Sequence, residues 1–295
     1  MGVAKRMLCD VCGMALLSHL PGLEVAMTKT DTIFAGSIPA LYDKYLGPLI
    51  FEPYAGDLAK RLSSLSSGRV LETAAGSGIV TRALLRSLPA SVGVVATDLN
   101  QPMLDHAAAQ TSFGNVSWQK VDAQALPYPD HTFDAVVCQF GVMFFPDKQK
   151  AYREARRVMK EGGRFIFNAW DRIEDNEFAD VVTAAMTDIF PNDPPLFLAR
   201  TPHGYHNKEV ILDDLRSAGF VDITVDTVTR RSVAPSCRDP AIGYCQGTPL
   251  RNEIEARDAS RLAEATEAAT RRISERFGKG SVAGKIQAHV ITAAY

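Results

Sequence analysis

Between positions 70 and 170, short runs of β-branched and other apolar residues alternate with segments in which apolar residues recur every three or four positions. The short runs predict buried strands, and the longer spacing is typical of amphipathic helices. Their alternation predicts βαβ units, which build a parallel sheet with helices on both faces. The predicted strands are Val70–Thr73, Gly93–Leu99, Val116–Val121, Asp134–Phe140 and Arg164–Trp170, and the predicted helices between them are Val80–Leu88, Pro102–Thr111 and Asp147–Lys160.

The chain on either side of this core continues the mixture of helices and strands. Upstream, Ile38–Leu65 predicts two helices broken near Gly47-Pro48 and Pro53. Within the core, Glu161-Gly162-Gly163 is expected to close the preceding helix, because glycine takes the left-handed conformation of a helix end. Downstream we predict a helix at Asn176–Phe190, an irregular loop at Pro191–His206, a helix at Glu209–Ala218, a strand at Val221–Thr229, a long charged helix at Arg251–Arg276 and an alternating strand at Lys285–Thr292.

Charge and composition narrow the classes of partner. The 295 residues include 32 Lys and Arg against 34 Asp and Glu, a formal net charge of −2. A domain that neutralises many phosphates usually has a basic excess, so this balance argues against nucleic acid and favours a small-molecule partner. No apolar run reaches the ~18–20 residues that span a bilayer, so we predict no stable membrane insertion and a cytoplasmic protein. Oligomeric state is left open.

The first 26 residues carry weak signals of their own. Lys5 and Arg6 precede an apolar patch, but Asp10 interrupts it, so we expect a peripheral or disordered extension and not a signal peptide. Met27 is an alternative start. Cys9 and Cys12 have the CxxC spacing of zinc or redox sites but lack a second pair of ligands. We therefore predict no metal site and leave the role of this pair open.

The stretch VLETAAGSGIVTRALL, from Val70 to Leu85, joins the first strand to the first helix of the core. Its glycines at positions 76 and 78 predict a tight turn that lets a ligand approach the backbone, and the helix that follows favours an anion at its N-terminus. Dinucleotides and S-adenosylmethionine both use this arrangement. The third glycine of the dinucleotide fingerprint is missing, and a turn without any ligand is the plain structural alternative.

Acidic residues follow the next two predicted strands. Asp98 ends the second strand, about twenty residues past the glycines, where a carboxylate can accept hydrogen bonds from both ribose hydroxyls of either cofactor class. Asp122 and Ala123 follow the third strand, where an acid beside a small residue can read the adenine amino group and ring nitrogen. Because the carboxyl ends of parallel strands share one edge, these residues form one expected site.

At this point the sequence resembles a class I S-adenosylmethionine-dependent methyltransferase of the branch similar to ubiquinone/menaquinone C-methyltransferases (methyltransferase type 11). The segments VLETAAGSG, VVATDLNQPML, DAQALPYPDHTFDAVVCQFGVMFFPD and EARRVMKEGGRFIFNAW carry the match in the family's order and span about Val70–Trp170. The resemblance implies a doubly wound α/β sheet of seven strands with an antiparallel last strand and a helical lid. It divides the chain into the extension 1–26, lid helices 27–68, a cofactor-binding core 69–170, and a lid insert with the last two strands and a helical insertion at 171–295.

The resemblance also implies roles for residues of the cofactor site, with S-adenosylmethionine as substrate and S-adenosylhomocysteine as product. Glu72 would face the methionine ammonium, and Asp98 would hold the ribose hydroxyls. The family usually has glycine at position 74, where this chain has alanine. The remaining implied contacts are Ala74, Gly76 and Gly78 along the methionine and ribose, Leu99 and Met103 against the adenine, Asp122 and Ala123 at the adenine edge, and Gln139 and Phe140 between cofactor and acceptor.

Methyl transfer from a sulfonium is an in-line displacement, so alignment and exclusion of water carry most of the catalysis. A general base is needed only for a protonated acceptor, and no base stands out. His203 and His206, around Tyr205, are the candidates for acid or base. Aromatic residues of the upstream helices, Tyr45 and Tyr54 in particular, could close over the sulfonium, although helix core is the plainer role for each.

Other functions leave different signatures. Amino-group methylation of nucleic acid bases commonly uses Asp/Asn-Pro-Pro-aromatic after the fourth strand, where this chain has Cys138-Gln139-Phe140-Gly141. A short-chain dehydrogenase needs a Tyr-xxx-Lys pair, and no tyrosine here has lysine four residues on. A domain that binds the cofactor without transferring its methyl group remains an alternative. We predict methyl transfer to a small organic acceptor, with the methylated atom left open.

Overall fold

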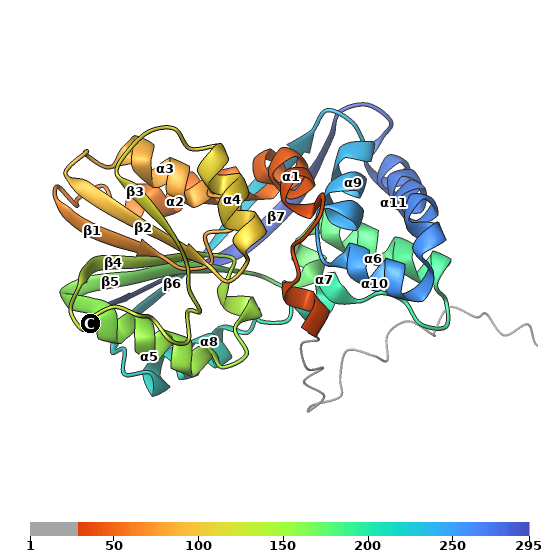
Figure 1. Ribbon diagram of the computed structural model, residues 1–295. Coiled ribbons are helices and arrows are strands. Elements are labelled where there is room, and N and C mark those ends of the chain that lie inside the picture. Colours follow the sequence, from red (N-terminus) through yellow and green to blue (C-terminus); the bar gives the residue numbers. More distant parts are fainter. Residues whose placement is uncertain (1–28, 295) are drawn as a thin grey trace, which may run out of the picture.

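The computed structural model describes residues 29–294, and a seven-stranded sheet runs through its centre (Figure 1). The strand order is β3-β2-β1-β4-β5-β7-β6. Neighbouring strands are parallel except for β7, which is antiparallel to both β5 and β6. The predicted doubly wound sheet with an antiparallel last strand is confirmed. The strands are β1 Gly68–Glu72, β2 Val92–Asp98, β3 Val116–Lys120, β4 Phe133–Gln139, β5 Met159–Trp170, β6 Asp222–Ala234 and β7 Val282–Ala294.

Helices cover both faces of the sheet and form a further group beside it. In Figure 1, α2, α3 and α4 lie on one side of the strands and α5 and α8 on the other, while α6, α7, α9, α10 and α11 gather at the right. The helices are α1 Ile38–Leu41, a π-helix at Tyr42–Phe51, α2 Glu52–Arg61, α3 Ile79–Ser87, α4 Gln101–Ala109, α5 Lys148–Val158, α6 Glu177–Ile189, α7 Phe197–Arg200, α8 Lys208–Ser217, α9 Arg238–Gln246, α10 Leu250–Asp258 and α11 Leu262–Phe277.

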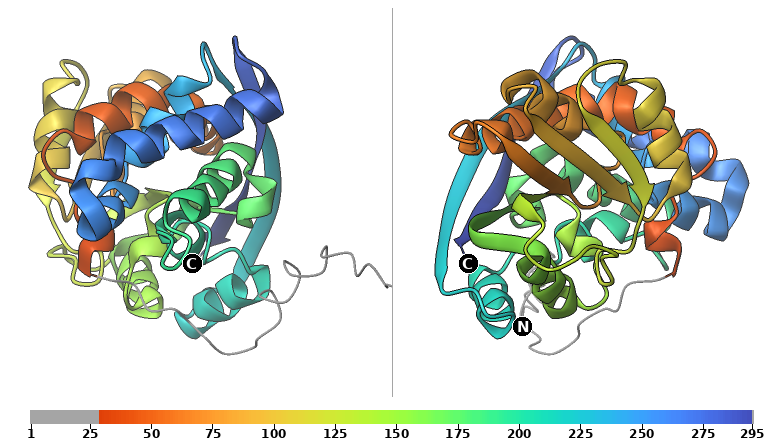
Figure 2. Two further views of the ribbon diagram at one scale, coloured as in Figure 1. Left: turned by 90° about the vertical axis from the view of Figure 1, so that its right-hand side faces the viewer. Right: turned by 60° about the vertical axis from the view of Figure 1, so that its left-hand side comes forward.

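Strands β6 and β7 are longer than the sequence predicted and connect the sheet to this helical group. The pairing of β5 with β7 stops at Trp170 and Ala288, but β6 and β7 stay paired as far as Ala234 and Val282. This two-stranded extension carries α9, α10 and α11 between its strands, as expected for an insertion between the last two strands (Figure 2). The prediction ended β6 too early because Arg230 and Arg231 interrupt the apolar pattern, and both are exposed.

The helices before the sheet are continuous, so the predicted break at Gly47-Pro48 is wrong. Pro48 lies inside the π-helix, whose wider turns are seen where the amide of Glu52 donates to the carbonyl of Gly47, five residues back. A proline lacks the amide that an α-helix would need, and a π-helical segment is one way to accommodate it. Pro53 is the second residue of α2 and leaves the helix unbroken, because proline is tolerated in the first turn of a helix.

The glycines at 162 and 163 do not close the preceding helix. Helix α5 ends at Val158, and Met159, already extended, begins β5. The register between β4 and β5 jumps from Phe133–Met159 to Ala135–Arg164, so the intervening residues bulge out of the ladder. Gly162, with φ of 75°, supplies the positive φ of that bulge instead of a helix cap.

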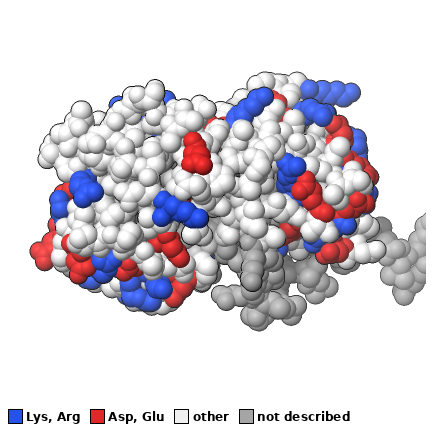
Figure 3. Space-filling model, in the orientation of Figure 1, with Lys and Arg blue, Asp and Glu red and all other residues white. Residues whose placement is uncertain are grey.

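Other boundaries differ in smaller ways. The predicted long helix at 251–276 is two helices, α10 and α11, joined by a 3₁₀ turn at Ala259–Arg261. The predicted loop 191–206 contains the short helix α7. The predictions for residues 1–26, including Cys9, Cys12 and the alternative start at Met27, lie outside the described residues. Among those described, no helix is long and apolar enough to cross a membrane. On the face shown in Figure 3, acidic and basic side chains are intermixed.

Candidate functional site

The carboxyl ends of β1 and β2 meet at one edge of the sheet, where the turn after β1 lies. The carboxylate of Asp98, at the end of β2, accepts a hydrogen bond from the amide of Gly76 at 2.8 Å and one from the amide of Asn100 at 2.7 Å. Asp98 therefore ties the glycine turn to the second strand. Burial raises the pKa of its carboxyl, and the amide hydrogen bonds oppose that rise.

The turn itself takes positive φ values at positions 74, 76 and 78. Gly76 has φ of 55° and Gly78 has φ of 79°, a region that glycine enters without steric cost. A side chain at Gly78 would also meet the ring of Trp118 at 2.9 Å. Ala74 has φ of 53°, where an L-residue with a side chain loses roughly 1–2 kcal/mol. Alanine at position 74, in place of the glycine usual in the family, thus adds backbone strain as well as a methyl group.

Glu72 ends β1 beneath this turn with only 1% of its surface exposed. One of its carboxylate oxygens accepts the hydroxyl of Thr81, from α3, at 2.5 Å. Burial raises the pKa of Glu72 to about 8, and the nearby Asp98 adds to the rise. In the unliganded fold Glu72 is therefore mainly protonated at neutral pH.

A small pocket, which we call the turn pocket, opens between the glycine turn and the π-helix. It contains two polar atoms, Oγ of Ser77 and Oε1 of Gln139, that are buried and hydrogen-bonded to no described residue. Buried polar atoms normally have a partner, so these two mark places for one. The lining residues are Tyr42, Phe51, Glu72, Ala74, Ala75, Gly76, Ser77, Ile79, Val80 and Gln139.

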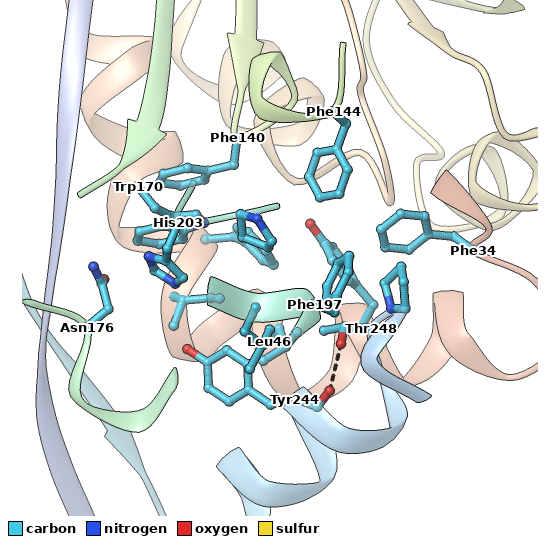
Figure 4. A pocket seen from close by; sticks show the side chains of 16 residues that line it. Phe34, Leu46, Phe140, Phe144, Trp170, Asn176, Phe197, His203, Tyr244 and Thr248 are labelled. Carbon is cyan, nitrogen blue, oxygen red and sulfur yellow. Dashed lines mark hydrogen bonds between the residues drawn. The ribbon is translucent and has the colours of Figure 1, made fainter. Parts of the chain in front are cut away.

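A second cavity, which we call the aromatic pocket, is shown in Figure 4. Tyr42 and Phe51 line both pockets, and their rings stack with centroids 4.7 Å apart. The two cavities therefore share this aromatic pair as a common wall. The aromatic pocket is lined by Phe34, Tyr42, Leu46, Ile50, Phe51, Phe140, Phe144, Trp170, Asn176, Phe197, Leu198, Pro202, His203, Tyr244, Thr248 and Pro249, none of them Lys, Arg, Asp or Glu.

Phe140, which lines the aromatic pocket, has an uncommon backbone conformation. Phe140 follows β4 with φ of 51°, and its amide donates to the side-chain oxygen of Asn168 at 3.0 Å. Its ring stacks face to face on Trp170, with centroids 3.7 Å apart. A non-glycine residue at positive φ stores strain, and the stack and the hydrogen bond keep it in place.

The π-helix explains why the aromatic pair is Tyr42 and Phe51, which sequence reasoning did not select. The selected Tyr54 is fully buried under Phe140 and Trp170, with its hydroxyl donating to the carbonyl of Val228. Tyr45 lines neither pocket. A π-helix brings residues four to five apart onto one face, so its pocket face carries residues 42, 46, 50 and 51. Recognising Pro48 as a π-helix signal would have shifted the prediction to this face.

Asp43, next to Tyr42 in the chain, anchors the start of the π-helix. The carboxylate of Asp43 accepts a hydrogen bond from Arg82, on α3, at 3.0 Å, and lies 3.4 Å from Nε2 of His106, on α4. His106 is half-buried. These contacts hold the start of the π-helix against the helices that follow the glycine turn.

The remaining residues of the expected adenine region lie beside the turn pocket and do not line it. Leu99 is 52% exposed although it is large and apolar, whereas Met103 is buried against the glycine turn. Asp122 is exposed, and its carboxylate accepts the amide of Gln124 at 2.8 Å. Ala123 is half-buried beside it. The structure thus places this set at the carboxyl edge of β2 and β3 without forming a closed cavity around it.

Of the acid or base candidates, only His203 lines the aromatic pocket. His203 is 5% exposed, and its Nδ1 lies 2.8 Å from the carbonyl oxygen of Asp171. Tyr205 points elsewhere, because its hydroxyl donates to Asp214 at 2.7 Å. His206 has its Nδ1 2.8 Å from the carbonyl of His203 and lies outside the pocket.

Comparison with known proteins gives a consistent result. A family model described as "Methyltransferase domain" matches residues 71–167. The ubiquinone/menaquinone biosynthesis C-methyltransferase UbiE of Pseudomonas aeruginosa strain LESB58 is 32% identical over 187 residues, which cover 59% of this chain and 73% of that protein. UbiE of Yersinia enterocolitica is 29% identical over 179 residues, 56% of this chain and 71% of that protein.

Solved structures share the fold at low identity. YcgJ of Bacillus subtilis matches with a TM-score of 0.53 and 18% identity, covering 82% of this chain and 97% of that one. The phosphoethanolamine N-methyltransferase 2 of Haemonchus contortus, solved in complex with S-adenosyl-L-methionine, matches with a TM-score of 0.55 and 15% identity over 87% of this chain and 56% of that one.

The turn pocket fits S-adenosylmethionine chemically. Its buried acid Glu72 forms no ion pair with a described residue, and the cofactor carries an ammonium and a sulfonium. Ser77 and Gln139 offer unused polar atoms, and Asp98 holds a carboxylate at the adjoining edge. Together with the relatives, these features identify S-adenosylmethionine as the cofactor, and the chain belongs to the class I S-adenosylmethionine-dependent methyltransferases.

Proposed function

We propose that this enzyme transfers the methyl group of S-adenosylmethionine to a small, uncharged organic molecule held in the aromatic pocket. The observation that carries the proposal is that the two pockets are neighbours with Tyr42 and Phe51 as their common wall. An in-line displacement needs donor and acceptor in adjoining spaces with their reacting atoms aligned. The cofactor supplies the electrophilic methyl group, and the chain's own residues position both molecules and exclude water.

Residues around the turn would divide the work of holding the cofactor. Glu72 would face the ammonium, and Asp98 would accept hydrogen bonds from the ribose hydroxyls. Tyr42 and Phe51 would place ring faces near the sulfonium, a contact worth about 0.5–2 kcal/mol. The other proposed contacts are Ala74, Gly76 and Gly78 along the methionine and ribose, Leu99 and Met103 against the adenine, Asp122 and Ala123 at its edge, and Gln139 and Phe140 toward the acceptor.

The lining of the aromatic pocket supports an uncharged acceptor. A charged group moved out of water needs a partner of opposite charge, because its desolvation is otherwise too costly. The described lining offers aromatic and aliphatic surface and no formal charge. The UbiE relatives are described as C-methyltransferases of ubiquinone and menaquinone biosynthesis, which is compatible with apolar acceptors. The methylated atom stays open at this level.

The proposal is tested by measuring formation of S-adenosylhomocysteine with a panel of charged and uncharged small acceptors. We expect turnover with uncharged aromatic or aliphatic members. Asp98→Ala should abolish it by weakening cofactor binding. Asp105→Ala is the matched control, because that exposed acid of α4 hydrogen-bonds, among the described residues, the side chain of Gln101. No turnover with any acceptor, despite calorimetrically measured cofactor binding, would refute methyl transfer to a small molecule.

A further inference from the structure

The aromatic pocket contains few polar groups that could act on an acceptor. The amide nitrogen of Asn176 donates to the carbonyls of Asp171, Arg172 and Gln287, and its oxygen accepts the amide of Gln287. The hydroxyl of Thr248 donates to the carbonyl of Tyr244 at 2.7 Å and accepts the amide of Leu250, the first of these being the bond drawn in Figure 4. Both side chains are therefore committed to the fold.

His203 differs, because one of its ring nitrogens is left for the pocket. Nδ1 faces the carbonyl oxygen of Asp171 at 2.8 Å, and a carbonyl can only accept. Nδ1 therefore carries the proton, and Nε2 keeps its lone pair. No described residue hydrogen-bonds Nε2. The ring lies beside Trp170, with centroids 6.0 Å apart, among the side chains that line the cavity (Figure 4).

The surroundings of His203 favour a neutral ring that can still accept a proton. Burial lowers the pKa of His203 to about 4, and His206 on the same loop adds to the decrease, while Asp171, after β5, opposes it. On β7, His289 lies 3.3 Å from the carboxylate of Asp171, and Tyr244 faces the cavity from α9. A carbonyl that holds the proton on Nδ1 and a lone pair left on Nε2 are the features of a base for a transient proton.

We propose that the acceptor is an uncharged aromatic alcohol and that Nε2 of His203 accepts its hydroxyl proton during transfer. This inference rests on the proposed function. The oxygen forms a bond to the methyl carbon as the sulfur–carbon bond breaks and its electron pair stays on sulfur. The hydroxyl proton moves to Nε2, and solvent later removes it. The products are a methyl ether, S-adenosylhomocysteine and one proton.

A weak base suffices for this step because the proton becomes strongly acidic as the oxygen bonds to carbon. The transfer also avoids a free aryloxide, for which the described lining offers no cation. The positive charge of the reactants ends on the imidazolium, near Asp171. His203 would then be a catalytic residue in contact with the acceptor, and removing such a base typically costs about 10²–10⁴ in rate.

The experiment compares 1-naphthol, 1-naphthylamine and 1-naphthoate, which share a ring system and differ in the reacting group. We expect the wild type to convert 1-naphthol to its methyl ether and to reject the naphthoate anion. His203→Gln should lower kcat for 1-naphthol roughly 10²-fold or more, with little change in KM or in cofactor affinity. The amine nitrogen attacks through its lone pair without losing a proton. The loss of kcat with 1-naphthylamine should therefore be at least tenfold smaller than the loss with 1-naphthol.

His206→Gln is the matched control, since that histidine also binds a carbonyl through Nδ1 but lies outside the pocket. Equal losses with alcohol and amine in His203→Gln would assign His203 a structural role and overturn the inference. Preference for the naphthoate, or a ring-methylated product from 1-naphthol, would also overturn it while leaving methyl transfer intact. Failure of all three probes with the cofactor bound would reject the acceptor class; failure of the wider panel as well would reject the proposed function.

Discussion

The buried carboxyl of Glu72 predicts that cofactor binding depends steeply on pH. Its pKa of about 8 lies well above the ordinary 4.5. Each unit corresponds to about 1.36 kcal/mol, so ionising this group in the unliganded fold costs roughly 4–5 kcal/mol. Because the folded pKa is raised, the protonated carboxyl of Glu72 contributes its full share to the stability of the fold below pH 4.5. That share is lost as the pH rises through 8. Glu72→Gln should remove this pH dependence of stability.

A cation placed beside Glu72 selects the ionised form, so binding must expel a proton at neutral pH. With a pKa of about 8, the dissociation constant of the wild type should fall about ninefold between pH 6 and pH 7. The ligand's own amino group stays protonated over that range. Glu72→Gln should bind more weakly and show no such change.

The assay is calorimetric titration of S-adenosylhomocysteine at pH 6 and pH 7, repeated in phosphate and imidazole buffers of different ionisation enthalpy. About 0.9 proton should be released per site by the wild type at pH 7, the fraction protonated at a pKa of about 8. Glu72→Gln should release none. Equal heats in the two buffers for the wild type, with an unchanged dissociation constant, would refute a protonated Glu72 facing the cofactor's ammonium.

Three further predictions follow from separate parts of the structure. Asp98→Asn should weaken binding of S-adenosylmethionine by about 10–100-fold in calorimetry, since a hydrogen bond to a charged group contributes about 1.5–3 kcal/mol; unchanged affinity would exclude Asp98 from the ribose site. Ala74→Gly should leave the melting temperature unchanged or raise it by about 1–3 °C, because relief of the positive φ offsets the entropy of glycine; Ala83→Gly, inside α3, should lower it, and equal losses in both would contradict strain at Ala74. Truncation after Gly280 removes β7, which lies between β5 and β6, and should yield insoluble protein; a folded truncation that binds the cofactor would contradict this topology.

The sequence predicted the centre of the parallel core well because β1, β2 and β4 are short, mostly buried strands. The spacing of Glu72, Asp98 and the glycines was enough to bring the turn and the acid together, since parallel strands end at one edge. The errors occur where a second interaction overrides local pattern. The glycines at 162 and 163 form a bulge because β5 must keep register with β4, which no local signal reports.

The acceptor side was harder to predict because its residues come from distant segments. Phe34, Phe144, Phe197 and Tyr244 share no motif and meet only when the helices pack. The choice between Tyr42 and Tyr45 depends on the π-helix, which displaces the helical face by about one residue per turn. His203 was identified as a candidate by its chemistry, but only the structure separates it from His206 and Tyr205.

The most direct test of this account is a crystal structure of the protein with S-adenosylhomocysteine bound. The account predicts the ammonium beside Glu72, the ribose hydroxyls on Asp98, and the sulfur next to the stacked rings of Tyr42 and Phe51, facing the aromatic pocket. A bound ligand whose sulfur is turned away from that pocket, or separated from it by Phe140 and Trp170, would contradict the assignment of the aromatic pocket as the acceptor site.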